Sequence, residues 1–135
     1  MSRPDPAPDH PHRPLVASGA EWEARFGYRR AVRIGDVVAV AGTTAPGPDA
    51  GAQARAAFRI ALDALAELGG TPADVIRTRM FITRMADHDA VGRAHAEVFG
   101  DAPPAATMVE VSALIAPDLL VEIELDAVVQ TRAGA

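Results

Sequence analysis

The most constraining stretch of this sequence is its last predicted strand, Leu119–Val129, where apolar and acidic side chains alternate. Side chains alternate across a strand, so one face of this strand is apolar and the other carries three carboxylates. The apolar face must be covered, which predicts a sheet with helices packed on one side. The apolar positions are Val121, Ile123, Leu125, Ala127 and Val129, and the acidic positions are Glu122, Glu124 and Asp126.

Helical periodicity predicts the covering layer. Apolar residues recur at spacings of three and four from Ala52 to Leu68, and Gly69-Gly70 ends this helix. A second helix is predicted from Asp87 to Phe99. The other strands are predicted at Tyr28–Ile34, Val37–Gly42, Val75–Thr83 and Thr107–Ser112, with a hairpin turn at Gly35-Asp36 and loops at Thr43–Gly51 and Asp101–Ala106. The order ββαβαββ indicates an α+β fold, with a mainly antiparallel sheet and two helices packed on one face.

Composition indicates one globular domain behind a proline-rich tail. The chain has 135 residues, of which 49% are hydrophobic, and this suits a single packed core. Residues 1–14 contain five of the eleven prolines and are predicted to be disordered, so the single domain is expected at residues 15–135. The chain has no cysteine, which excludes disulfides, a thiolate nucleophile and cysteine-ligated zinc.

Charge and hydropathy narrow the classes of partner. The formal net charge is −5, and an acidic protein is poorly suited to nucleic acid, which attracts positive surfaces. No apolar run approaches the roughly 20 residues of a membrane span. No charged and then apolar leader opens the sequence. We therefore expect a cytoplasmic protein with neither a nucleic-acid partner nor a membrane partner.

The sheet face turned away from the helices is predicted to be charged. In Val75–Thr83, alternation places Ile76, Met80 and Ile82 on one side and Arg77, Arg79 and Phe81 on the other. The strand Thr107–Ser112 adds Met108 and Glu110 to the charged side. The charged set is then Arg77, Arg79, Glu110, Glu122 and Glu124. The residues alone leave two interpretations open, a solvated sheet face or an interface between copies of the chain.

Four ordered segments carry a resemblance to a known family. They are GYRRAVRIGDVVAVAG, VIRTRMFITRM, VGRAHAEVFG and PPAATMVEVSALIAPDLLVEIELDAV. In this order and at this length they resemble the RidA family, also called YjgF or Rid, over Gly27–Val129. The resemblance implies a chorismate-mutase-like fold and a homotrimer with helices outside. It also implies a small-molecule pocket in each cleft between subunits, so it favours the interface interpretation of the charged face.

The resemblance also implies a reaction and the residues for it. Deaminases of this family hydrolyse enamines and imines such as 2-aminoacrylate to keto acids and ammonia, without a metal or organic cofactor. The cleft tyrosine matches Tyr28, the glycine after the second strand matches Gly42, and the glutamate that positions water matches Glu122. The arginine that grips the substrate carboxylate matches Ala106, and the usual cysteine beside it matches Met108.

The alanine at the arginine position changes the expected specificity. A methyl group cannot make the two parallel hydrogen bonds that guanidinium gives a carboxylate, so we expect an altered substrate or ligand in place of standard deamination. Arg79 either supplies the missing cation or pairs with Glu110 or Glu124. Glu122 is either a general base acting on water or a counter-charge for Arg79. The predicted pocket comprises Tyr28, Gly42, Thr43, Arg79, Ala106, Met108 and Glu110, with Glu122 as the catalytic candidate.

Two other functions compete with a cofactor-free hydrolase. The first is a trimeric binding or scaffold protein without catalysis, in which the cleft residues only hold a ligand. The second is ribonuclease activity, sometimes attributed to this family. The acidic balance and the lack of a basic stripe with stacked aromatic residues count against the ribonuclease.

Overall fold

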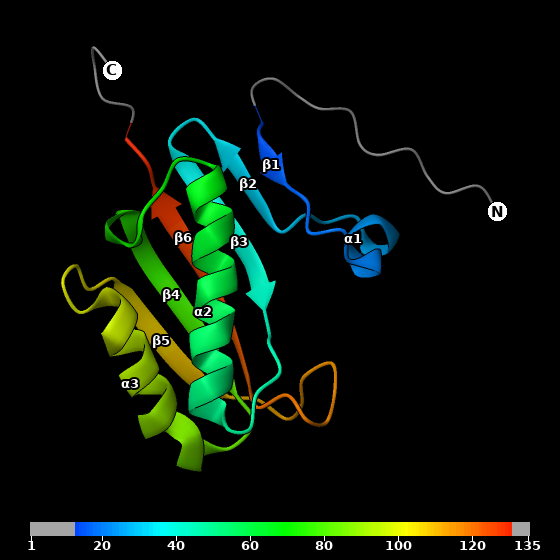
Figure 1. Ribbon diagram of the computed structural model, residues 1–135, viewed down its shortest axis with the longest axis vertical. Coiled ribbons are helices and arrows are strands. Elements are labelled where there is room, and N and C mark those ends of the chain that lie inside the picture. The colour runs from blue at the N-terminus through cyan, green and yellow to red at the C-terminus, as the bar shows by residue number, and fades with distance from the viewer. Residues whose placement is uncertain (1–12, 131–135) are drawn as a thin grey trace.

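A computed structural model of the chain describes residues 13–130 as one six-stranded sheet with two helices across one face (Figure 1). The strand order is β1-β2-β3-β6-β4-β5. The elements are β1 (Leu15–Val16), α1 (Glu21–Phe26), β2 (Ala31–Ile34), β3 (Val37–Thr43), α2 (Ala50–Glu67), η1 (Pro72–Asp74), β4 (Val75–Ile82), η2 (Met85–Asp87), α3 (His88–Phe99), β5 (Ala105–Glu110) and β6 (Val121–Val128), where η marks a 3₁₀ turn.

Strand pairing confirms the predicted fold class. All neighbouring strands are antiparallel except β4 and β5, which run parallel. Ile34 pairs with Val37 across a two-residue turn, in which Gly35 has a φ of 59°, a left-handed conformation that favours glycine. The predicted order ββαβαββ holds, with α2 and α3 on one face. The sequence patterns did not predict β1 and α1.

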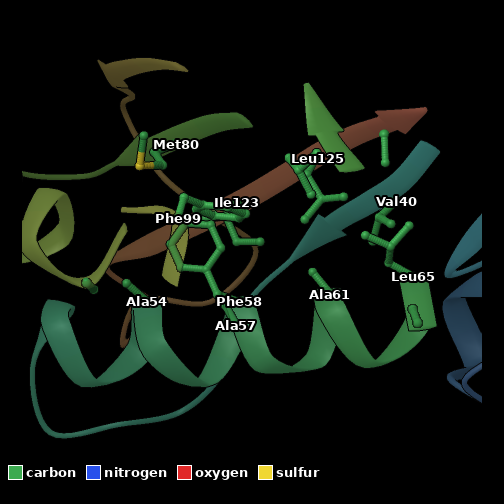
Figure 2. Packing of buried hydrophobic residues seen from close by; sticks show 14 of the residues in the cluster. Val40, Ala54, Ala57, Phe58, Ala61, Leu65, Met80, Phe99, Ile123 and Leu125 are labelled. Atoms are coloured by element: carbon green, nitrogen blue, oxygen red, sulfur yellow. The ribbon is translucent and has the colours of Figure 1, made fainter. Parts of the chain in front are cut away.

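The core lies between β6 and the apolar face of α2. Val121, Ile123, Leu125 and Ala127 are all fully buried, as their alternation predicts. Figure 2 shows Phe58, Ala61 and Leu65 of α2 reaching towards Ile123, Leu125 and Val40. Each large apolar side chain buried in this way contributes about 1.5–3 kcal/mol relative to exposure. The buried face of β6 therefore contributes strongly to the packing of the helices on the sheet.

The loop predicted at Thr43–Gly51 is shorter than expected at both ends. Thr43 closes β3, and α2 already begins at Ala50. The helix starts early because the Asp49 carboxylate accepts a hydrogen bond from the Ala52 amide at 2.9 Å, which satisfies one of the free donors of the first turn. The prolines between these points remain outside both elements.

Most of the predicted tail, residues 1–14, lies outside the described residues, as do residues 131–135 of the predicted domain. Its last residue, Pro14, is placed, and its carbonyl accepts a hydrogen bond from the Arg33 amide at 2.8 Å. The described part of the chain is therefore already attached to β2 at Pro14, one residue before the predicted start of order.

The predicted faces of β5 are wrong. The parallel ladder aligns Met108 with Met80 and Glu110 with Ile82, and both of these β4 partners are buried beneath the helices. Met108 packs against the core. Glu110 lies on the same side and accepts a hydrogen bond from the Met85 amide at 2.8 Å. The segment Ala105–Glu110 alternates only weakly in polarity, so its pattern could not fix which side faces the core.

A second correction concerns the start of β4. Val75 pairs with Ala127 and Arg77 pairs with Asp126, so an extra β4 residue is accommodated between them. This irregularity places Val75 in the core and leaves Ile76 54% exposed. The prediction that Ile76 lies on the helix-covered face is therefore wrong, although it is right for Met80 and Ile82.

Candidate functional site

The open face of the sheet carries an ion-pair cluster between β4 and β6. The register places Arg79 opposite Glu124, and its Nη1 lies 3.4 Å from Glu124 Oε1 and 3.2 Å from Asp126 Oδ2. The predicted pair with Glu124 is confirmed. The predicted alternative with Glu110 is wrong, because Glu110 lies on the other face of the sheet. Arg79 is thus occupied by two carboxylates of its own chain.

Glu122 lies beside this cluster and against Gly42. A β-carbon built on Gly42 would stand 3.2 Å from Glu122 Cδ and 3.3 Å from Oε2. Those distances are tighter than ordinary van der Waals contact, so the absence of a side chain at Gly42 makes room for the carboxyl group. The structure therefore brings together two of the predicted site residues, Gly42 and Glu122.

The surroundings of Glu122 hinder its ionisation. Burial raises the pKa of Glu122 above its ordinary value of 4.5, and the Glu124 carboxylate raises that pKa further. The Arg30 guanidinium acts in the opposite direction and lowers the Glu122 pKa. A half-buried carboxyl group with a raised pKa is a physically reasonable proton acceptor for a water molecule.

Arg30 is a charged neighbour of Glu122 that the sequence patterns did not predict. Its Nη1 donates to Ala41 O at 3.4 Å, to Gly42 O at 3.3 Å and to Thr43 Oγ1. An arginine just before a strand gives no sequence signal of the direction in which its side chain turns. The segment GYRRAVR contains three arginines, and only the fold separates their roles.

Thr43 has little freedom to contact a ligand through its hydroxyl within one chain. Its side chain is 1% exposed, and its Oγ1 donates to Ala41 O at 2.8 Å while accepting from Arg30. Tyr28, in contrast, is 37% exposed and lies within the segment that links α1 to β2. Its amide donates to Glu23 O at 3.0 Å, which fixes its backbone.

One chain does not bring all the predicted pocket residues together. Ala106 and Met108 lie on the edge strand β5, and β4 separates β5 from β6. With about 4.8 Å between neighbouring strands, the two groups are roughly 10 Å apart across the sheet. Ala106 also pairs with the buried Thr78, on the face opposite Glu122. Within a single chain the predicted site is thus divided into two halves.

Two kinds of feature are absent from residues 13–130. No helix in that range has both the length and the apolarity needed to cross a membrane. No group of three or more histidine, aspartate or glutamate residues in it is arranged to hold a metal ion.

Sequence comparisons place the chain among proteins with this fold. The model of the family described as Endoribonuclease L-PSP matches residues 19–129. The uncharacterized protein SCO2049 of Streptomyces coelicolor is 43% identical over 119 residues, covering 83% of this chain and 89% of the relative. The 3-aminoacrylate deaminase RutC of Acinetobacter baylyi is 36% identical over 75 residues, covering 56% of this chain and 59% of the relative.

Solved structures agree with the sequence comparisons. Rv2704 of Mycobacterium tuberculosis, described as a member of the YjgF/YER057c/UK114 family, superposes with a TM-score of 0.85 at 54% identity. The match covers 87% of this chain and 99% of the other. The resemblance identified from the four sequence segments is thereby confirmed: this chain belongs to the YjgF/Rid family, whose family model is described as Endoribonuclease L-PSP.

Proposed function

We propose that this protein is a homotrimer that hydrolyses a small imine, enamine or related adduct in clefts between its subunits, with Glu122 activating water. The observation that carries the proposal is the half-buried Glu122 carboxyl group against Gly42, with its pKa raised by burial. A base of this kind, partly withdrawn from solvent, suits proton removal from a bound water molecule.

The chemistry requires only water and proton transfer. Glu122 accepts a proton from water, and the hydroxide forms a bond to the imine carbon while the carbon–nitrogen π electrons move to nitrogen. The nitrogen takes that proton back from Glu122, which gives the carbinolamine. Glu122 then removes the proton of the carbinolamine hydroxyl and passes it to the nitrogen, the carbon–nitrogen bond breaks, and ammonia leaves as the carbonyl forms. An enamine first takes up a proton at carbon and loses one from nitrogen, which makes it the imine. No oxidant or reductant is consumed.

Two features of the single chain support a site completed by another copy. Its open sheet face carries the Arg79 ion pairs together with exposed apolar residues, such as Val37 at 57% and Val109 at 41%. An apolar surface mixed with paired charges is suited to burial between subunits. The division of the predicted pocket between β5 and β6 supports the same assembly, because a neighbouring chain can supply the missing half.

The substrate class follows from a relative and from one substitution. RutC is named for the deamination of 3-aminoacrylate, which is a small enamine. In this chain Ala106 takes the position at which the resemblance places a carboxylate-binding arginine. We therefore propose a substrate whose recognition does not depend on a carboxylate held at Ala106, and we expect slow turnover of 2-aminoacrylate and 3-aminoacrylate.

Ammonia release and solution mass test the proposal together. Ammonia is measured from a panel of small imines and enamines, including 2-aminoacrylate generated in situ, with the native chain and E122Q. The matched control is E67Q, which makes the same change at an exposed glutamate at the end of α2. We expect a trimer mass by analytical ultracentrifugation, and turnover of at least one panel member that E122Q lowers by about 100-fold and E67Q leaves unchanged.

Three results would contradict the proposal. A monomeric mass would show that no cleft is shared between subunits. Full activity in E122Q would show that Glu122 does not activate water in the reaction. Tight binding of panel compounds without any ammonia release would favour the binding or scaffold alternative.

A further inference from the structure

We propose that Arg30 is a positioning residue of this site, which holds the β3 bulge beneath Glu122 and supplies a fixed positive charge there. The inference deepens the proposed function and rests on it for its catalytic meaning. It concerns two charged groups that both meet Gly42: the Arg30 guanidinium donates to the Gly42 carbonyl, and the Glu122 carboxyl packs where a β-carbon of residue 42 would stand. The effect of one group on the other can be measured without any substrate.

The first step is the bulge itself. Val40 pairs with Leu125 and Thr43 with Ile123, so three steps along β3 match two steps along β6. Such a bulge takes backbone groups out of the regular ladder, and they need other partners. Arg30 Nη1 donates to the carbonyl groups of both intervening residues, Ala41 at 3.4 Å and Gly42 at 3.3 Å.

Arg30 is attached to the bulge through its backbone as well. Its carbonyl accepts a hydrogen bond from the Ala41 amide at 2.9 Å. Its side chain then reaches Thr43 Oγ1, which in turn donates to Ala41 O. One residue therefore contacts every residue from Ala41 to Thr43, the segment that presents Gly42 to Glu122.

The charge of Arg30 matters in addition to its hydrogen bonds. Its Nε is buried and has no hydrogen-bond partner among the described residues. A buried donor without an acceptor costs about 1–3 kcal/mol. The guanidinium makes its hydrogen bonds to the bulge in spite of that cost, so we consider its positive charge as well.

The charged groups around Glu122 show what the guanidinium does. On β6, Glu124 opposes ionisation of Glu122, and on β4 the residue opposite Glu122 is the neutral Phe81. Arg79 on β4 is engaged with Glu124 and Asp126. Arg30 is the group that lowers the Glu122 pKa, against burial and Glu124. Without the charge of Arg30, burial and Glu124 should therefore raise the Glu122 pKa further.

The test is an NMR titration of the Glu122 side-chain carboxyl carbon in the full-length protein, assigned with E122Q. We expect R30Q to move the Glu122 midpoint upward by about one pH unit and R30K to keep it close to the native value. The matched control is R29Q, which removes the same charge one residue away. Arg29 donates to Tyr28 O at an exposed site and does not reach the bulge. The Glu122 midpoint should therefore be the same in R29Q as in the native protein.

The titration and the activity measurement fail independently. An unchanged Glu122 midpoint in R30Q overturns the inference whatever the activity. A shifted midpoint combined with full activity in E122Q supports the Arg30–Glu122 pair and overturns the proposed function. Where both hold, the acidic limb of the pH–rate profile should move upward in R30Q by the same amount as the midpoint, and R30K should restore it.

A measurement on the native protein covers the case in which R30Q does not fold. The ¹⁵Nε resonance of Arg30 should shift with the Glu122 midpoint, because the two groups sense each other's charge. The Arg29 resonance should not shift at that pH. An Arg30 resonance that ignores the Glu122 titration would contradict the inference.

Discussion

At the scale of single residues, the proposed site depends on two residues that are unusually small, Gly42 and Ala106. Gly42 leaves room for the Glu122 carboxyl group, because a β-carbon there would come within 3.2 Å of it. Ala106 ends in a methyl group at the position where the resemblance expects an arginine. The first small residue lies against the proposed base. Under the proposed function, the second leaves the cleft without a carboxylate-binding group at that position.

Replacing Gly42 with alanine separates positioning from stability. The glycine does not have a positive φ, so alanine fits the backbone and gains about 0.4–1 kcal/mol from the less flexible unfolded chain. Its methyl group must displace the Glu122 carboxyl by a few tenths of an ångström. We expect G42A to unfold in urea at nearly the native midpoint and to lose about tenfold in kcat. Native kcat in a folded G42A would show that the close approach is not needed.

Placing an arginine at residue 106 tests the proposed specificity. A bidentate guanidinium–carboxylate contact contributes several kcal/mol when it is desolvated, so A106R should raise kcat/KM for 2-aminoacrylate by at least about tenfold. A106K supplies the charge without the planar fork and should give a smaller gain. If native protein turns over this substrate as fast as A106R does, Ala106 does not set the preference.

At the scale of the elements, α3 is attached to β4 by a polar contact within an otherwise apolar layer. His95 Nε2 and Thr78 Oγ1 share a hydrogen bond of 2.8 Å, and Thr78 is fully buried. The imidazole also meets Phe58 and Phe99, with ring centroids 5.7 and 4.8 Å away. Burial lowers the pKa of His95 below its ordinary value of 6.5, so folding favours the neutral form of the ring.

This contact makes stability depend on pH. The unfolded chain binds a proton at His95 more readily than the folded chain, so stability is fully present above pH 6.5 and declines as the pH falls below it. We expect the urea midpoint of the native protein to fall between about pH 7 and pH 5, and the H95Q midpoint to fall less. If the urea midpoints of the native protein and H95Q fall equally over that range, His95 is not the cause of the pH dependence.

The success of sequence prediction also differed from element to element. Alternation in β6 and the three-and-four spacing in α2 are strong because each element buries one continuous face, and both were predicted correctly. The segment Ala105–Glu110 has weak alternation, so neither its parallel register nor the side of Met108 could be read from it. The β3 bulge and the turn of Arg30 into it depend on pairing with β6, which no local pattern encodes.

At the scale of the whole molecule, the covered and open faces of the sheet have different roles. The helices bury one face in the core, whereas the other carries paired charges and exposed apolar residues. Under the proposed assembly, three copies bury these open faces together. The stability of the assembly and the completeness of each cleft then depend on the same surface.

A charge placed on that surface should separate the subunits. V109D puts a carboxylate on the open face at a residue that is 41% exposed in one chain, and an unpaired charge buried in an interface is strongly unfavourable. We expect V109D to sediment as a folded monomer. The matched control is I60D, at a residue of α2 that is 43% exposed, and it should keep the native mass. A trimeric V109D would place the interface elsewhere.

The separation of β5 from β6 by β4 has a genetic consequence. Suppose that each cleft takes Glu122 from one chain and Ala106 from its neighbour. A mutation on β6 then damages the half of the cleft that one chain supplies, and a mutation on β5 damages the half that the neighbouring chain supplies. Two inactive variants, one damaged in each half, would then complement each other when subunits exchange, because some mixed clefts inherit both intact halves. Hybrid oligomers would regain a fraction of the native turnover that neither parent shows alone.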